Sequence, residues 1–315
     1  MSLPVLVELV RSGVVESTHA GSVVALRADG STALSLGVVD RPVFPRSSNK
    51  PLQAVGLLDA GWSPPDAECL ALATASHSGL PAHLAVVRRT LSAAGLTENA
   101  LGCPALLPLD VEAAHALLRG GGEATRLTMN CSGKHAAMLA TCVANGWPTE
   151  GYLAPDHPVQ QAMTSTIEQL ARERVQHVAV DGCGAPQHAL TLTGLARAFT
   201  ALATGEGSTR RTADAMRAHP GLVGGPGREV SRLIEGIPGL VAKDGAEGVF
   251  AAALPDGASA AVKVADGSTR AAVPMLVGAL RALGVTAEVL DELATTPVLG
   301  GGVPVGVLRR TALLA

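Results

Sequence analysis

Hydrophobic and polar positions follow one pattern at the two ends of the chain and another in the middle. Residues 4–10 (PVLVELV), 22–37 (SVVALRADGSTALSLG) and 248–267 (GVFAAALPDGASAAVKVADG) are rich in Val, Ala and Leu and are interrupted by turn-forming pairs, which is typical of strands in hairpins. The predicted tight turns are the Asp-Gly pairs at 29–30, 256–257 and 266–267.

Between these ends, apolar residues recur near i, i+3 and i+4, which predicts helices. The predicted helical segments are 84–95, 110–121, 132–146, 158–174, 187–205, 208–219 and, late in the chain, 274–284. Asp110 and Ser132 are candidate N-caps, and Gly120 and Gly146 are candidate C-terminal stops. The glycine runs 221–228 (GLVGGPGR) and 298–306 (VLGGGVPVG) are interpreted as loops.

Strands at both ends and helices between them predict an α+β fold. The expected architecture is one antiparallel sheet from both chain ends, flanked by helices, beside a central helical region. We expect a single domain over residues 1–315, with a sheet part at about 1–45 and 240–315 and a mostly helical part at about 46–239. A cleft is expected where the two parts meet.

Composition narrows the class of protein. Hydrophobic residues make up 47% of the 315 residues and charged residues 16%, as in a folded chain rather than a disordered one. The net charge of −3 without a basic block argues against a nucleic-acid partner. No apolar run of about 18 residues and no cationic leader stand out, so no membrane partner is expected. Five widely spaced cysteines indicate reduced thiols and a cytoplasmic location.

The stretch PRSSNKPLQA at 45–54 contains a candidate nucleophile. In one helical turn, Ser47 and Lys50 share a face, and a neutral Lys50 can take the proton of the Ser47 hydroxyl. Pro51 is tolerated in a first helical turn, so the helix is expected to start close to this motif. Alone, S-x-x-K is more often the pattern of a capped helix start with a solvated lysine. The strand-like residues 38–45 before it and the apolar stretch after it favour the catalytic interpretation.

Other polar residues occur in loop-like stretches and on a late strand. Ser76, His77 and Ser78 follow an apolar run; they are either catalytic groups, including those of a Ser-His hydrolase, or a polar turn. Lys243 and Lys263 occur among the C-terminal strands. A second lysine beside Lys50 would lower the pKa of both.

A third candidate site combines thiols with nitrogen groups. Cys131, Lys134 and His135 fall on one face at the start of a predicted helix, and Cys183 lies in the loop-like VDGCGAP. Two thiolates and a nitrogen ligand can hold a zinc ion. The alternative is that the cysteines are buried and inert.

Taken together, these stretches resemble the asparaginase II family (Rhizobium-type L-asparaginases). The resemblance is carried by ELVRSGVVESTHAGSVV, FPRSSNKPLQA, ASHSG, NCSGKHAAML, DGCGAP, HPGLVGG, KDGAEGVF and AVKVADG, in this order. It implies a fold similar to serine β-lactamases and glutaminases, hydrolysis of L-asparagine to L-aspartate and ammonia, and a homodimer.

The resemblance also implies a role for individual residues. Ser47 with Lys50, and Ser76 with Lys263, match two Ser-Lys pairs. Cys131, Lys134 and Cys183 match a zinc site near the catalytic centre. The implied substrate-binding residues are Arg46 and Asp181, with His135 in the pocket wall.

The chain departs from the family pattern in three places. Residues 101–110 (LGCPALLPLD) lack an expected histidine, Leu80 replaces an acidic residue, and 298–302 lack an expected asparagine. These departures bear on substrate affinity and range more than on the fold. Two alternatives therefore stay open: a hydrolase of another amide (glutamine, a β-lactam or a peptidoglycan peptide), and a non-catalytic, zinc-stabilised binding protein.

Overall fold

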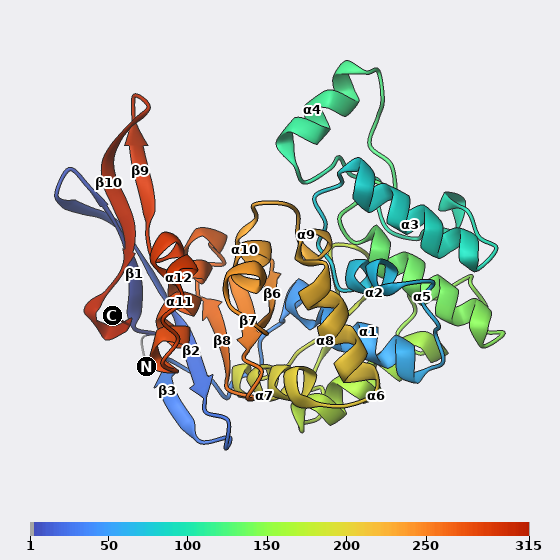
Figure 1. Ribbon diagram of the computed structural model, residues 1–315, viewed down its shortest axis with the longest axis horizontal. Coiled ribbons are helices and arrows are strands. Elements are labelled where there is room, and N and C mark those ends of the chain that lie inside the picture. Colours follow the sequence, from blue (N-terminus) through green and yellow to red (C-terminus); the bar gives the residue numbers. More distant parts are fainter. Residues whose placement is uncertain (1–2, 315) are drawn as a thin grey trace.

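The computed structural model describes residues 3–314. Its main element is an eight-stranded sheet in the order β6-β7-β8-β2-β1-β10-β9, with β3 paired to β2 (Figure 1). Each adjacent pair is antiparallel. The strands are β1 (Val5–Arg11), β2 (Val14–Leu26), β3 (Thr32–Leu36), β6 (Val241–Gly245), β7 (Val249–Ala253), β8 (Ser259–Val264), β9 (Thr296–Gly300) and β10 (Val303–Arg310). The predicted α+β class, with a sheet assembled from both chain ends, is confirmed.

Helices fill the middle of the chain and return near its end. They are α1 (Lys50–Asp59), α2 (Ala67–Ala73), α3 (Pro81–Ala93), α4 (Val111–Arg119), α5 (Ser132–Ala144), α6 (Pro158–Ala171), α7 (Leu192–Thr204), α8 (Ser208–Ala218), α9 (Pro220–Val223), α10 (Glu229–Gly236), α11 (Ala272–Ala282) and α12 (Glu288–Leu293). A small hairpin, β4 (Val178–Val180) with β5 (Pro186–His188), lies between α6 and α7. Among the described helices, none is both long and apolar enough to cross a membrane.

Several local predictions are corrected by the structure. Residues 298–306 form most of the β9–β10 hairpin rather than a loop, because β10 pairs with β1 as well as with β9. Cys131, not Ser132, is the N-cap of α5, since the Ser132 hydroxyl donates to Leu127 O at 2.8 Å. The strand-like lead-in at 38–45 contains only an isolated bridge. Asp110 does cap α4, accepting the backbone N–H of Ala113.

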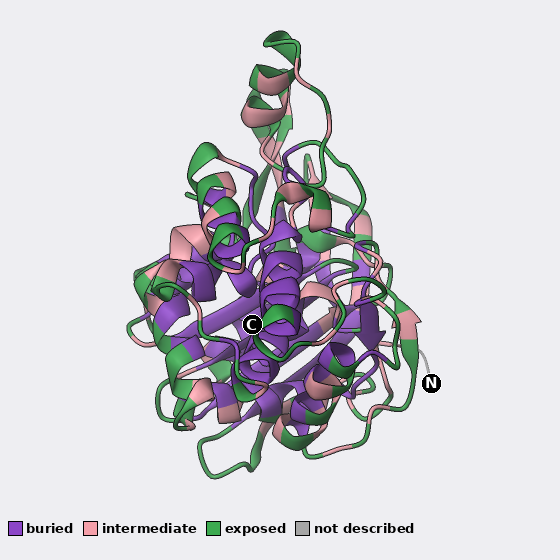
Figure 2. Cartoon of the chain, turned by 90° about the vertical axis from the view of Figure 1, so that its right-hand side faces the viewer, coloured by how far each residue is buried: buried purple, intermediate pink, exposed green. Residues whose placement is uncertain are grey.

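The buried residues form two hydrophobic clusters, and α1 contributes to both. Leu52 and Val55 join the cluster on the sheet, whereas Leu57 and Leu58 join the cluster of the helical region. Burial is concentrated in the middle of the molecule, and the projecting helix α4, at the top of the view, has no buried residue (Figure 2). The element that follows Ser47 therefore packs between the two parts of the chain.

The sheet places its β6 end beside the helical region (Figure 1). Successive residues of β7 are buried, which requires cover on both faces, and α7 and α11 both pack against β2, β7 and β8. At Gly245 on β6, a Cβ atom would lie only 2.5 Å from Pro45 O and 3.2 Å from Ser48 N. Glycine therefore lets this strand approach the start of α1, and the candidate site lies at this junction.

Candidate active site

Ser47 lies at the junction where the chain enters α1. It belongs to the 3₁₀ turn Arg46–Asn49, which runs directly into α1 with Pro51 in the first turn, so the predicted helix start at this motif is confirmed. Arg46 has a φ of 53°, a left-handed conformation that is uncommon outside glycine and found repeatedly at functional sites. Ser47 is half-buried, and its neighbour Ser48 is buried. The Ser47 side chain is thus partly accessible at a constrained turn.

Lys50 is buried, and its ammonium group reaches away from the turn. Nζ donates to Ala75 O at 2.6 Å, to Ser76 Oγ at 3.1 Å and to Cys131 Sγ at 3.0 Å. Ser47 Oγ is not among its hydrogen-bond partners. The lysine of S-x-x-K therefore connects α1 to the loop after α2 and to the start of α5.

The second lysine at this position is Lys243, on β6. Its Nζ lies 3.2 Å from Ser76 Oγ and is also paired with the carboxylate of Asp244. Burial and, to a lesser extent, the charges of Lys50 and Arg228 together lower the pKa of Lys243 to about 8, against the opposing effect of Asp244. Ser76 Oγ is thus held between two buried amines, one of which is partly neutral near pH 8.

Lys263, which the sequence pairs with Ser76, lies elsewhere. It is half-buried on β8, and its Nζ donates to the backbone carbonyls of Glu247 and Val264. The structure therefore assigns Lys243 as the lysine that faces Ser76 across the junction. The sequence signal was Lys243-Asp244-Gly245 on a strand, a variant of the K-T-G motif that accompanies S-x-x-K in serine β-lactamases.

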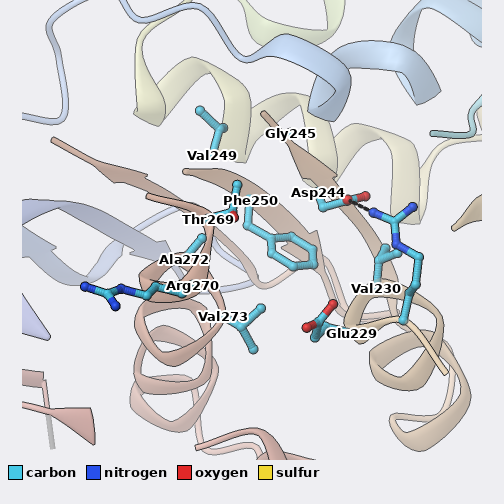
Figure 3. A pocket seen from close by; sticks show the side chains of 11 residues that line it. Glu229, Val230, Asp244, Gly245, Val249, Phe250, Thr269, Arg270, Ala272 and Val273 are labelled. Atoms are coloured by element: carbon cyan, nitrogen blue, oxygen red, sulfur yellow. Dashed lines mark hydrogen bonds and ion pairs between the residues drawn. The ribbon is translucent and has the colours of Figure 1, made fainter. Parts of the chain in front are cut away.

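A cavity of about 360 Å³, lined by both polar and apolar residues, adjoins this cluster. Figure 3 shows Asp244 and Gly245 of β6 at one wall, with Phe250 and Glu229 beside them. Asp244 Oδ2 accepts a hydrogen bond from Arg228 at 2.8 Å. The Asp244 carboxylate therefore both contacts Lys243 and borders this cavity, from which a small molecule could contact it.

Arg46 and Asp181, the predicted substrate-binding residues, form an ion pair. Arg46 Nε lies 2.8 Å from Asp181 Oδ1, and Glu247 lies 4.0 Å from Arg46 Nη1. The Arg46 side chain is 27% exposed and that of Asp181 only 8%. The guanidinium is thus oriented by a shielded carboxylate while staying accessible beside Ser47.

His77 and Ser78 do not form a catalytic pair with Ser76. His77 Nδ1 accepts the backbone N–H of Gly79, so Nε2 donates to Ser132 Oγ at 2.8 Å. Burial, with neighbouring positive charge, holds the pKa of His77 well below its usual value. Ser78 Oγ donates to Gly224 O. His77 is a neutral structural group, which leaves no Ser-His arrangement in this loop.

The predicted metal-ligating residues are brought together behind Lys50. Lys134 Nζ lies 3.2 Å from Cys183 Sγ. The hydrogen bond with Cys131 and the nearby charge of Lys134 lower the pKa of the Cys183 thiol. The hydrogen bond with Cys183 and burial raise the pKa of the Cys131 thiol. Burial alone would lower the pKa of Lys134, but the charges of Cys183 and Cys131 raise it. These pKa shifts favour the thiolate form of Cys183 beside the ammonium form of Lys134, 3.2 Å away.

The donor set allows a zinc ion on one condition. Among residues 3–314 there is no group of three His, Cys, Asp or Glu side chains that could hold a metal, so the third ligand has to be Lys134 in its neutral form. His135 Nε2 is buried and has no hydrogen-bond partner within the part of the chain that the structure describes; its Nδ1 lies 2.7 Å from the Tyr152 hydroxyl. His135 therefore lies deep behind the thiols rather than in an open pocket wall.

Comparisons with known proteins give the family of the chain. A family model described as L-asparaginase II matches residues 7–310, nearly the whole chain. A search of curated proteins gave no match. Among solved structures, the chain is similar to EstCE1, a hydrolase with promiscuous acyltransferase activity, at 12% identity and a TM-score of 0.38, over 82% of this chain and 87% of that one.

Proposed function

Because the chain belongs to the L-asparaginase II family, a family of hydrolases acting on asparagine-type amides, we propose that it hydrolyses L-asparagine to L-aspartate and ammonia through a serine nucleophile activated by lysine. One observation carries the proposal. Ser76 Oγ lies 3.1 Å from Lys50 Nζ and 3.2 Å from Lys243 Nζ. Two buried amines on one hydroxyl form a proton-transfer chain and are a costly arrangement for structure alone.

The proposed chemistry uses Ser47 as the nucleophile. Its oxygen attacks the side-chain amide carbon. Because Lys50 Nζ and Lys243 Nζ contact Ser76 Oγ and not Ser47 Oγ, the proton of Ser47 has to reach a neutral amine of the lysine cluster through a bridging group. The same proton goes to the leaving nitrogen, so that ammonia departs and an acyl-serine remains. In the turn at Arg46–Asn49, the backbone N–H of Ser48 already donates to Pro45 O at 3.1 Å. The oxyanion donor in this proposal is therefore the backbone N–H of Ser47 itself.

The pair of Ser76 and Lys243 would serve deacylation. A hydroxyl carries one proton and two lone pairs, so Ser76 can accept from the Lys50 ammonium while donating to a neutral Lys243. With a pKa of about 8, about a tenth of Lys243 is neutral at pH 7. That amine can take a proton from the water that attacks the acyl-serine. The bond between the acyl carbon and Ser47 Oγ then breaks, the proton returns to Ser47 Oγ, and L-aspartate is released.

Recognition of the amino acid is assigned to the ion pair beside Ser47. The Arg46 guanidinium presents a planar set of donors that suits an α-carboxylate. Asp181, held 2.8 Å from Arg46 Nε, offers a carboxylate to the α-ammonium. A zinc ion, if held by Cys131, Lys134 and Cys183, would fix these residues behind Lys50 and would not serve as the catalytic electrophile.

The experiment that tests the function measures ammonia release from L-asparagine by the wild type and by Ser47→Ala. We expect the variant to keep its circular dichroism spectrum and lose more than about 99% of turnover, since it lacks the attacking oxygen. Turnover near the wild-type rate would contradict the assignment. Glutamine and a β-lactam, run as parallel substrates, distinguish the other amide hydrolases.

The geometry also supports a second assignment, in which Ser76 is the nucleophile, because Ser76 rather than Ser47 contacts both amines. Mass spectrometry of the enzyme quenched during turnover locates the acyl group on the peptide of one serine or the other. An absence of any turnover and any acyl-serine would favour the non-catalytic binding protein. The homodimer and the cytoplasmic location remain predictions.

A further inference from the structure

Arg228 contacts both halves of the Ser76–Lys243 pair, yet the proposed reaction gives it no role. It is the residue before α10, and its side chain is 29% exposed. Nη1 donates to Ser76 O at 2.6 Å, and Nη2 donates to Asp244 Oδ2 at 2.8 Å. One rigid fork therefore spans the loop that carries Ser76 and the strand that carries Lys243.

The segment before Arg228 runs along the Ser76 loop. The backbone N–H of Ser76 donates to Val223 O at 3.2 Å, and that of Ser78 donates to Gly224 O at 2.9 Å. The same segment thus holds the N–H of Ser76 through a backbone carbonyl and its C=O through Arg228. The position of Ser76 Oγ between the lysines depends on this segment.

Asp244 links Arg228 to the lysine. Its two carboxylate oxygens have different partners, Lys243 for Oδ1 and Arg228 for Oδ2. Without Arg228, Lys243 would be the sole cation paired with this half-buried carboxylate. The carboxylate would then hold the Lys243 ammonium more tightly and draw it away from Ser76.

We propose that Arg228 is a positioning residue: it sets the spacing between the Ser76 loop and β6, so that Ser76 Oγ reaches both Lys50 and Lys243. The inference rests on the proposed function. Arg228 touches neither serine hydroxyl through its own hydrogen bonds; it acts through Ser76 O and Asp244.

The proposal makes a specific statement about pH. The charged groups that act on Lys243 are Asp244 on its own strand, Lys50 from α1 and Arg228 from the segment before α10. Removing Arg228 takes away a positive charge and leaves Asp244 wholly to Lys243. Both changes favour the ammonium form, so the pH at which Lys243 becomes a base moves upward.

The test compares Arg228→Gln, Arg228→Lys and a control, Arg232→Gln, by kcat and KM for L-asparagine between pH 6 and 10. Arg232 lies one turn further along α10 in an exposed ion pair with Glu292. We expect Arg228→Gln to lower kcat about 100-fold with KM changed less than about threefold, as a displacement of catalytic groups does. The rise of kcat with pH, which reports the deprotonation of Lys243, should move to higher pH in this variant.

Arg228→Lys keeps the positive charge but cannot make both guanidinium hydrogen bonds at once. We therefore expect a smaller loss of kcat, and a rise of kcat with pH at nearly the same pH as in the wild type. Arg232→Gln should keep kcat within about twofold, since exposed ion pairs contribute little. Wild-type kcat and pH profile in a folded Arg228→Gln would overturn the proposal. If that variant does not fold, the proposal stands or falls on Arg228→Lys, where an unchanged kcat overturns it.

A second readout separates this inference from the identity of the substrate. Labelling of the serines by a fluorophosphonate, located by mass spectrometry, reports activation of the hydroxyls even if asparagine is not turned over. Failure of the wild type to release ammonia would contradict the proposed function alone. Equal labelling rates in wild type and Arg228→Gln across the pH range would contradict the role of Arg228.

Discussion

At the scale of single residues, the two C-terminal lysines provide a matched pair of variants. Lys243 faces Ser76, whereas Lys263, on β8 of the same sheet, donates to backbone carbonyls of Glu247 and Val264. We expect Lys243→Met to reduce kcat for L-asparagine by about 10³-fold, within the range for loss of a general base, and Lys263→Met to change it less than about threefold. The reverse ranking, measured by ammonia release, would restore the pairing expected from the sequence.

The pKa of Lys243 also predicts the pH dependence of the reaction. Burial lowers this pKa from the ordinary value of 10.5 to about 8. Because the base has to be neutral, kcat should rise with pH through about 8 and level off about one unit higher. Initial rates of ammonia release from pH 6 to 10 test this. A limb centred near 10 would mean that Lys243 is not buried as described or is not the base.

Residue patterns alone predicted part of this site. Ser47, Lys50, Ser76 and the thiols were found because each lies in a short motif with its own chemistry. The choice between Lys243 and Lys263 depended on which strand forms the sheet edge beside the helices, and that is a tertiary property. Arg228 carries no local signal, since an arginine before a helix is common on any surface.

At the scale of elements, the approach of β6 to the start of α1 depends on Gly245. A Cβ atom there would lie 2.5 Å from Pro45 O, a backbone atom that cannot swing aside. We expect Gly245→Ala to push β6 from the turn that carries Ser47, to lower unfolding free energy by about 1–3 kcal/mol and to reduce kcat at least about tenfold. Thermal unfolding and ammonia release measure the two effects.

Gly221→Ala is the control for that substitution. Gly221 lies in α9, and a Cβ atom there would meet nothing within 4 Å. Its stability should be unchanged or slightly higher, because alanine restricts the unfolded chain. A Gly245→Ala enzyme as stable and active as this control would show that β6 and the turn are not held at a critical distance.

Elements with a strong local period were predicted well, and those fixed by their neighbours were not. The segments that became α3, α4, α5, α6, α7, α8 and α11 show their helical period in the sequence. The hairpin of β9 and β10 was mistaken for a loop because its glycines are turn formers, and its strands are defined by pairing with β1. Short helices such as α10 offer too few turns for a period to be recognised.

At the scale of the whole molecule, the site joins segments that are far apart in the sequence. Lys50 belongs to α1, Cys131 precedes α5, Cys183 lies between β4 and β5, and Lys243 comes from the C-terminal part of the sheet. Each lysine of the site has its serine or thiol hydrogen-bond partner on a different segment: Lys50 contacts Ser76 and Cys131, Lys134 contacts Cys183, and Lys243 contacts Ser76. The site can therefore form only once the sheet and the helical region have packed together.

This arrangement predicts that zinc would stabilise the fold as a whole. An ion held by Cys131, Lys134 and Cys183 would bind only where α5 and the β4–β5 hairpin have come together, so it should favour the folded state, by about 2.7 kcal/mol at 100 times Kd. Thermal unfolding with and without Zn²⁺, together with metal analysis after dialysis, measures this. Cys183→Ser should lose the shift, whereas Cys142→Ala, a buried cysteine of α5 outside the cluster, should keep it. If Zn²⁺ shifts the thermal unfolding of both variants equally, the ion binds elsewhere. If chelation lowers kcat without any loss of stability, the metal takes part in the chemistry itself.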